Sequence, residues 1–253
     1  MTEFCAHIDR LFTELPFAER CRAARRSGFS SVEFILPKDV PLGELGDAVA
    51  YDGLKPCLME MPEAEAAFAF WKKTKKDFGA SMDRMLEVAD FIGCRLLYVP
   101  GRVLSEEDFE ASREAFIAAL HRAAQDARRA GVKILLGFRN AVETPGFYPA
   151  STLEVLQILD ELNDDRAFGC LYDVYQAQTV EGGLSNTLES LSEIIAHIRI
   201  AGVPSGEEPD IGEVDYGYLF ALLEARGYAG QIGCAYTPRR TTAEGLKWMQ
   251  EYL

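Results

Sequence analysis

Short apolar runs alternate with longer amphipathic runs along almost the whole chain. The apolar runs are rich in Val, Ile, Leu, Phe and Cys and nearly continuous, which is typical of parallel strands that are covered on both faces of the sheet. The pattern predicts strands at Phe4–Ile8, Ser31–Leu36, Lys55–Met59, Arg95–Val99, Lys133–Phe138, Phe168–Val174, Ile194–Ile200 and Gln231–Tyr236.

Helices are predicted between these strands. Pro16 suits the first turn of one helix, and Ser105 is the expected N-cap of another because acidic residues follow it. The predicted helices are Phe17–Ser27, Trp71–Ile92, Glu106–Ala130, Ser151–Glu161, Gly183–Ser192, Tyr216–Arg226 and Thr242–Leu253. Four of them are expected to end at a glycine: Gly28, Gly93, Gly131 and Gly227.

The alternation of strand and helix predicts an α/β fold, a closed (β/α)₈ TIM barrel, as a single domain over residues 1–253. A doubly wound sheet is the alternative, but the chain has no GxGxxG motif or P-loop. Functional residues of such barrels lie where the strands end at their carboxyl side. The corresponding positions are His7, Glu33, Glu60, Arg102, Gly137–Asn140, Asp173–Gln178, Arg199–Glu213 and Ala235–Arg239.

Composition and charge narrow the classes of function. The chain has 253 residues, 48% of them hydrophobic, and a net charge of −14. An acidic chain repels nucleic acid and anionic membrane surfaces, and no apolar stretch reaches the roughly 20 residues that span a bilayer. The start of the chain shows no secretory signal, and the six scattered cysteines are expected to be free thiols without zinc, so a cytoplasmic protein is predicted.

Four segments resemble the hydroxypyruvate isomerase family of xylose-isomerase-like barrels. They are LFTELPFAERCRAARRSGFSSVEFILP, LYDVYQAQTVEGGL, HIRIAGVP with EPDIGEVDY, and GCAYTPRRTTAEGL. Members of that family hold one divalent metal with a Glu, an Asp, a Gln or His, and a second Glu, one at the end of each of strands five to eight. The resemblance implies that the two glutamates move a proton between adjacent carbons of a hydroxy-carbonyl substrate, while the cation polarises the carbonyl.

This chain departs from the family pattern at these positions. Gly137 and Ala235 stand where the two glutamates are expected, and Arg199 stands at the glutamine position. Asp173 is retained, but Gln176 replaces a nearby histidine. One carboxylate beside a guanidinium does not hold Mg²⁺ or Mn²⁺. We therefore expect no metal site of the family type, no cofactor, and no two-glutamate proton shuttle.

Arginine is the predicted replacement for the metal charge. Arg199 is expected to point into the pocket, as is Arg139, which lies two residues after Gly137, if the strand persists that far. The hypothesis is a metal-independent enzyme that isomerises, epimerises, cyclises or dehydrates a small anionic or hydroxy-carbonyl compound. Asp173 would be the acid or base, with Arg199 and Arg139 as cationic anchors. The predicted substrate-binding residues are Gln176, Glu208, His7, His197 and Arg102.

Two other interpretations stay open. Arg199 and Asp173 would form an ion pair in an inactive barrel that binds a small anion or a partner enzyme. Alternatively, Glu33, Glu60 or Glu208 would rebuild a metal site with Asp173 in an ordinary hydroxypyruvate isomerase, although solvated side chains at the strand ends are the default for Glu33 and Glu60. A homo-oligomer is expected from the resemblance alone.

Overall fold

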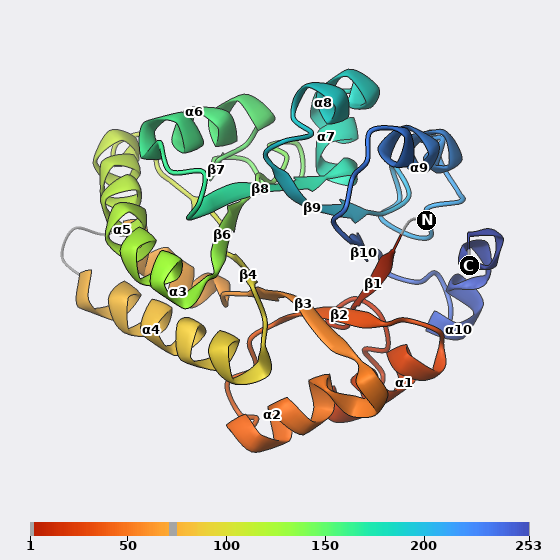
Figure 1. The fold of residues 1–253 in the computed structure, drawn as a ribbon. Coiled ribbons are helices and arrows are strands. Elements are labelled where there is room, and N and C mark those ends of the chain that lie inside the picture. Colours follow the sequence, from red (N-terminus) through yellow and green to blue (C-terminus); the bar gives the residue numbers. More distant parts are fainter. Residues whose placement is uncertain (1–2, 71–74, 253) are drawn as a thin grey trace. The chain divides into compact units, whose positions relative to one another are not determined.

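The protein folds as a closed barrel of eight parallel strands with helices between them (Figure 1). The structure is a computed structural model that describes residues 3–70 and 75–252. The strand order around the barrel is β1-β10-β9-β8-β6-β4-β3-β2. The strands are β1 (Phe4–His7), β2 (Ser31–Ile35), β3 (Lys55–Glu60), β4 (Leu96–Tyr98), β6 (Lys133–Leu136), β8 (Phe168–Asp173), β9 (Ile195–Ile200) and β10 (Ile232–Cys234). The predicted TIM barrel is confirmed.

Helices follow the strands as the alternation predicts. They are α1 (Phe17–Arg26), α2 (Leu42–Val49), α3 (Glu63–Ala66), α4 (Lys75–Ile92), α5 (Phe109–Ala130), α6 (Thr152–Leu162), α7 (Val174–Val180), α8 (Leu184–Ser190), α9 (Tyr216–Ala225) and α10 (Thr242–Gly245). Short 3₁₀ turns lie at η1 (Tyr51–Gly53), η2 (Ala67–Phe70) and η3 (Lys247–Glu251). Gly28, Gly93, Gly131 and Gly227 all have positive φ, as expected where helices end.

Several element predictions were wrong. Ser105 is not the N-cap of α5, which starts after Asp108; instead the Ser105 hydroxyl accepts the Asp108 N–H at 3.3 Å in the preceding turn. The predicted helix Thr242–Leu253 divides into α10 and η3. Helices α2, α3 and α7 were not predicted. Residues 71–74, the predicted start of α4, and Leu253 lie outside the described residues.

Two compact units make up the chain. The first contains Met1–Phe34, Val40–Cys57 and Tyr172–Leu253, and the second contains Ile35–Asp39 and Leu58–Leu171. The prediction that 1–253 is one domain stays a prediction. Within the described residues, no helix is both long enough and apolar enough to cross a bilayer.

Strand register aligns the polar residues of the first unit. Phe4 packs its ring against Phe220 and Trp248, with ring centroids 5.2 and 5.3 Å away, so it faces the helices. Because side chains alternate along a strand, Cys5 and His7 face the opposite way, to the inner side of the sheet. The parallel register pairs His7 with Glu33, Cys5 with Gly233, and Gly233 with Arg199. Acidic, basic and imidazole side chains therefore share one inner face.

The second unit contains an antiparallel ribbon in addition to its barrel strands. Strands β5 (Arg102–Val103) and β7 (Phe147–Tyr148) pair Arg102 with Tyr148. Helices α3, α4 and α5 lie together in Figure 1. Phe70 of η2 stacks on Phe116 of α5, with ring centroids 4.2 Å apart. The ribbon brings the loop after β4 beside the loop after β6, which defines one cavity of this unit.

Gly101 marks the tightest approach in that ribbon. A Cβ at this position would lie 2.0 Å from the carbonyl oxygen of Tyr148, whereas a Cβ on Gly43 of α2 would meet nothing within 4 Å. We expect Gly101→Ala to lower the free energy of unfolding by about 1–3 kcal/mol, because the backbone must shift. Gly43→Ala is the matched control and should be neutral or stabilise by up to about 1 kcal/mol. Urea denaturation of both variants checks this, and equal stabilities would contradict the close approach.

Candidate functional site

A buried ion pair lies on the inner face of the first unit. The Arg199 Nε donates to Glu33 Oε2 at 3.0 Å, and both side chains are almost removed from solvent. Glu33 was expected to be a solvated residue at the end of its strand, but it is 0% exposed, and Glu60 is also buried. Both expectations were wrong, because alternation turns Glu33 inward beside His7. Arg199 is thus held by a carboxylate that comes from a strand far away in the sequence.

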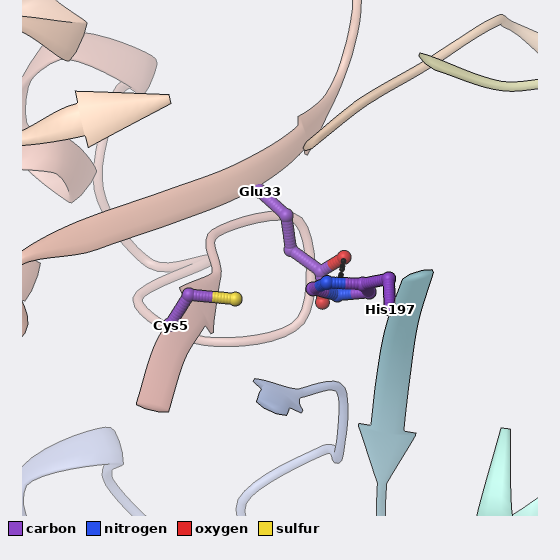
Figure 2. Close-up of side chains that lie close together, drawn as sticks. All are labelled: Cys5, Glu33 and His197. Atoms are coloured by element: carbon purple, nitrogen blue, oxygen red, sulfur yellow. Dashed lines mark hydrogen bonds and ion pairs between the residues drawn. The ribbon is translucent and has the colours of Figure 1, made fainter. Parts of the chain in front are cut away.

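His197 completes this anchor. Its Nε2 lies 3.1 Å from the same Glu33 Oε2 (Figure 2). Gly233 makes room for the carboxylate, since a Cβ there would lie 2.1 Å from Glu33 Oε1 and 3.0 Å from His197 Nε2. Among the described residues, Glu33 Oε1 and His197 Nδ1 have no hydrogen-bond partner. Buried polar atoms of this kind normally bind water or a ligand.

Electrostatics keep Glu33 ionised. Burial by itself raises the pKa of Glu33, but the positive charge of Arg199 and the hydrogen bond with His197 lower it well below the usual range of a carboxyl group. Cys5, in contrast, is held in its uncharged form. Its thiol lies near Glu33 and His197 in Figure 2. Burial raises the pKa of Cys5 well above its normal value, so this thiol stays protonated.

His7 is a neutral imidazole beside this ion pair. It is 4% exposed, and burial lowers its pKa to about 3, with Arg199 lowering it further against the opposing charge of Glu33. Its Nδ1 has no hydrogen-bond partner among the described residues. A buried neutral imidazole with a free nitrogen can accept or relay a proton.

Asp173 lies where β8 ends and α7 begins. Its Oδ1 accepts the backbone N–H groups of Tyr175 and Gln176 at 3.0 and 3.2 Å, so the carboxylate caps α7. Removal from solvent raises the pKa of Asp173, and the charge of Arg199 and the two N–H groups only partly oppose that shift. The structure therefore brings Asp173 into the electrostatic field of Arg199.

Glu208 fixes the loop that follows β9. The carboxylate is buried, and its Oε1 accepts the backbone N–H of Arg239 at 3.0 Å. Its Oε2 has no hydrogen-bond partner among the described residues. Asp215 caps α9, because its side chain accepts the Tyr218 N–H. Glu208 thus joins this loop to the chain after β10.

Arg139 and Arg102 belong to the second unit. Strand β6 ends at Leu136, so the premise that it continues to Arg139 was wrong. Arg139 lies in the following loop, where its backbone N–H donates to the Pro149 carbonyl at 3.2 Å and its guanidinium pairs with Glu63. Arg102 lies on β5, and Arg102 and Arg139 both line the cavity of the second unit beside the β5–β7 ribbon.

Comparison with known proteins identifies the family. A family model described as a xylose isomerase-like TIM barrel matches residues 21–252. The chain belongs to this family. It is 33% identical to the 2-oxo-tetronate isomerase of Haemophilus influenzae and 29% identical to the hydroxypyruvate isomerase of Escherichia coli, with 100% of each chain covered. A Brucella melitensis structure described as an AP endonuclease of family 2 is 32% identical, with a TM-score of 0.94 over 100% of this chain and 99% of that one.

The residues of this family member do not fit the divalent metal that the resemblance implies. Gly137 and Ala235 offer no side-chain donor, and a Cβ on Gly137 would lie 2.9 Å from the Leu171 carbonyl oxygen. Arg199 carries a positive charge, and the Oδ1 of Asp173 already accepts two N–H groups. The nearby trio Cys5, Glu33 and His197 offers donor atoms within 4.8 Å of one another. The thiol of Cys5 is protonated, and the carboxylate of Glu33 already binds Arg199. This trio therefore suits a guanidinium rather than a hard divalent cation.

Sequence reasoning missed Glu33 as the partner of Arg199. The sequence did contain a signal for this. Glu33 and His197 each interrupt a largely apolar strand, and a polar side chain there must face either the inside of the barrel or the surrounding helices. The choice of the inward direction depends on which apolar neighbours meet the helices. That information is in the tertiary packing and not in either segment alone.

The low pKa of His7 predicts how the free energy of unfolding changes at acidic pH. The unfolded chain takes up a proton near pH 6.5, whereas folded His7 does so near pH 3, so the unfolded state binds more protons between these values. Stability should therefore fall as the pH falls below 6.5, by up to about 1.4 kcal/mol per pH unit. His7→Asn should reduce the pH dependence of the free energy of unfolding between pH 6.5 and 4.5. Above pH 7 the pH dependence should stay the same as in the native chain.

Urea midpoints measured from pH 7.5 to 4.5 check this expectation. Protonation of Glu33 lowers the stability only below pH 4.5, the pKa of this group in the unfolded chain, because its pKa in the folded protein is lower still. His121→Asn, on the exposed side of α5, controls for the loss of an imidazole elsewhere. An unchanged slope in His7→Asn would contradict a buried neutral His7.

Proposed function

We propose that this protein is an isomerase of the hydroxypyruvate isomerase type that uses a fixed guanidinium in place of the family's metal. The observation that carries the proposal is the anchoring of Arg199 by Glu33 at 3.0 Å, with His197 on the same carboxylate oxygen. A guanidinium held in this way keeps its charge and its orientation. It supplies a cation where a substrate oxygen becomes negative.

Asp173 is the proposed acid and base. Its raised pKa brings a carboxyl group closer to the pH at which proton transfer is most efficient. The carboxylate takes a proton from the carbon next to the substrate carbonyl, and Arg199 stabilises the resulting enediolate oxygen. Asp173 then returns that proton to the neighbouring carbon, so that the hydroxyl and carbonyl groups exchange places.

The exchange also moves a proton between the two substrate oxygens. His7 is proposed for this relay, because its imidazole stays neutral near pH 7 and its Nδ1 is free of other hydrogen bonds among the described residues. Gln176 is proposed to orient the substrate from the first turn of α7, and Glu208 from the loop after β9. His197 acts mainly through Glu33 and is proposed as a positioning residue.

The relatives support this type of reaction and substrate. Two full-length relatives are named 2-oxo-tetronate isomerase and hydroxypyruvate isomerase. Both named compounds are small carboxylates that carry a carbonyl group, and a guanidinium fork suits both groups. We therefore propose a small hydroxy-carbonyl carboxylate as substrate. Epimerisation, cyclisation and dehydration begin with the same proton abstraction and stay alternatives for the reaction type.

The remaining interpretations of the sequence are also proposals. A catalytic role for Arg139 is weakened, because its guanidinium already pairs with Glu63. A barrel that binds a small anion or a partner enzyme without turnover is the second candidate, and the structure alters its premise: Arg199 has Glu33 as an ion-pair partner. A rebuilt metal site loses support, because Glu33 and Glu208 are already engaged. A cytoplasmic homo-oligomer without nucleic-acid partners stays a prediction.

Substitution of Asp173 separates chemistry from folding. Asn caps a helix about as well as Asp, so Asp173→Asn should keep α7 and the stability of the protein. Loss of the titratable group should lower turnover on the order of 10²–10⁴-fold. Asp173→Ala should lose the same turnover and, in addition, about 1 kcal/mol of stability with the cap.

The assay uses chelator-treated protein with hydroxypyruvate or 2-oxo-tetronate in D₂O, followed by proton NMR. Conversion is the expected result for the native chain, with deuterium at the reacting carbon in those turnovers in which the proton on Asp173 exchanges with D₂O before it is returned. Arg226→Gln, which removes a surface ion pair with Glu189, is the control with unchanged turnover. Full turnover by Asp173→Asn would refute the assignment, whereas thermal stabilisation by these acids without conversion would favour the non-catalytic binder.

A further inference from the structure

The second unit has a cavity of about 290 Å³ with a positive lining. The loop after β4 contributes Gly101, strand β5 contributes Arg102, and the loop after β6 contributes Arg139 and Thr144. Phe147 of β7 and the short helix α3 complete it. Two guanidiniums and a hydroxyl group thus line one small cavity, which is a suitable set of donors for an anion.

Arg139 is held in place before any ligand arrives. Its guanidinium lies over the Phe147 ring, 4.7 Å from the centroid, and its backbone N–H donates to the Pro149 carbonyl. An arginine fixed by stacking and by its own backbone loses little conformational entropy when it binds a carboxylate or phosphate.

A carboxylate of the chain itself already contacts this arginine. Glu63, the first residue of α3, forms an ion pair with Arg139. The Glu63 side chain is 55% exposed, so it can turn into solvent at little cost. The Glu60 carboxylate also acts on Arg139 electrostatically. Without Glu63, the guanidiniums of Arg139 and Arg102 would both remain in the lining of the cavity.

We propose that this cavity is a binding site for a small carboxylate or phosphate group, held by Arg139 and Arg102, and that Glu63 occupies the site in the absence of ligand. The ligand displaces the Glu63 carboxylate from Arg139 and takes over its hydrogen bonds. No covalent step is involved. This inference does not depend on the reaction proposed at Asp173 and Arg199, because none of those residues lines the cavity.

Because Glu63 competes with the ligand for Arg139, removal of this carboxylate should strengthen the binding of an anion rather than weaken it. Calorimetric titration of the full chain with inorganic phosphate and, separately, with malonate distinguishes the two sources of negative charge. Glu63→Gln should tighten binding of the preferred anion by about tenfold, because one charge-assisted hydrogen bond no longer has to break. Arg139→Gln should weaken it at least tenfold, and Arg102→Gln should also weaken it.

Two controls keep the result specific. Glu65→Gln changes a neighbouring acid of α3 that pairs with Arg84, and Arg129→Gln removes an exposed guanidinium from α5. Neither should alter the affinity. The proposal would be overturned if Glu63→Gln bound neither anion more tightly, or if binding were unchanged in Arg139→Gln. Should Arg139→Gln fail to fold, the Glu63→Gln comparison alone decides the outcome.

Discussion

The ion pair between Glu33 and Arg199 is the interaction on which the rest of the site depends. Both charges are removed from solvent, and the desolvation cost of such a pair is compensated only when its geometry is good and further hydrogen bonds are present. His197 and the space left by Gly233 supply these conditions. Removal of either partner would leave the other charge buried alone, which typically costs about 3–5 kcal/mol.

This constraint also determines the chemistry that the site can perform. Arg199 places a permanent positive charge near Asp173 and His7. The charge holds Glu33 ionised, helps to keep His7 neutral, and limits how far the pKa of Asp173 rises. A divalent metal in the family's manner would need carboxylates where the chain has Gly137 and Ala235. The proposed exchange of metal for guanidinium would therefore be one coordinated change of charge across several strands, and not the loss of single ligands.

Much of the fold could be predicted from the sequence, because parallel strands are short, apolar and regularly spaced. The helix over 42–49 was missed because Pro41, Gly43 and Gly46 are typical of a loop, whereas burial of Leu45 and Val49 stabilises it in the structure. In the site, the sequence shows directly that Gly137 and Ala235 carry no side-chain donor. The partner of Arg199 could not be predicted, because the inward direction of Glu33 and the end of β6 before Arg139 are decided by tertiary packing.

The most direct test of the central claim is calorimetric titration of the chelator-treated protein with Mn²⁺. If Arg199 replaces the metal, no binding heat should appear up to millimolar Mn²⁺, because Asp173 alone among the four family positions offers a carboxylate. Stoichiometric binding with micromolar affinity would contradict the account. It would mean that carboxylates from elsewhere in the chain have rebuilt a metal site beside Arg199.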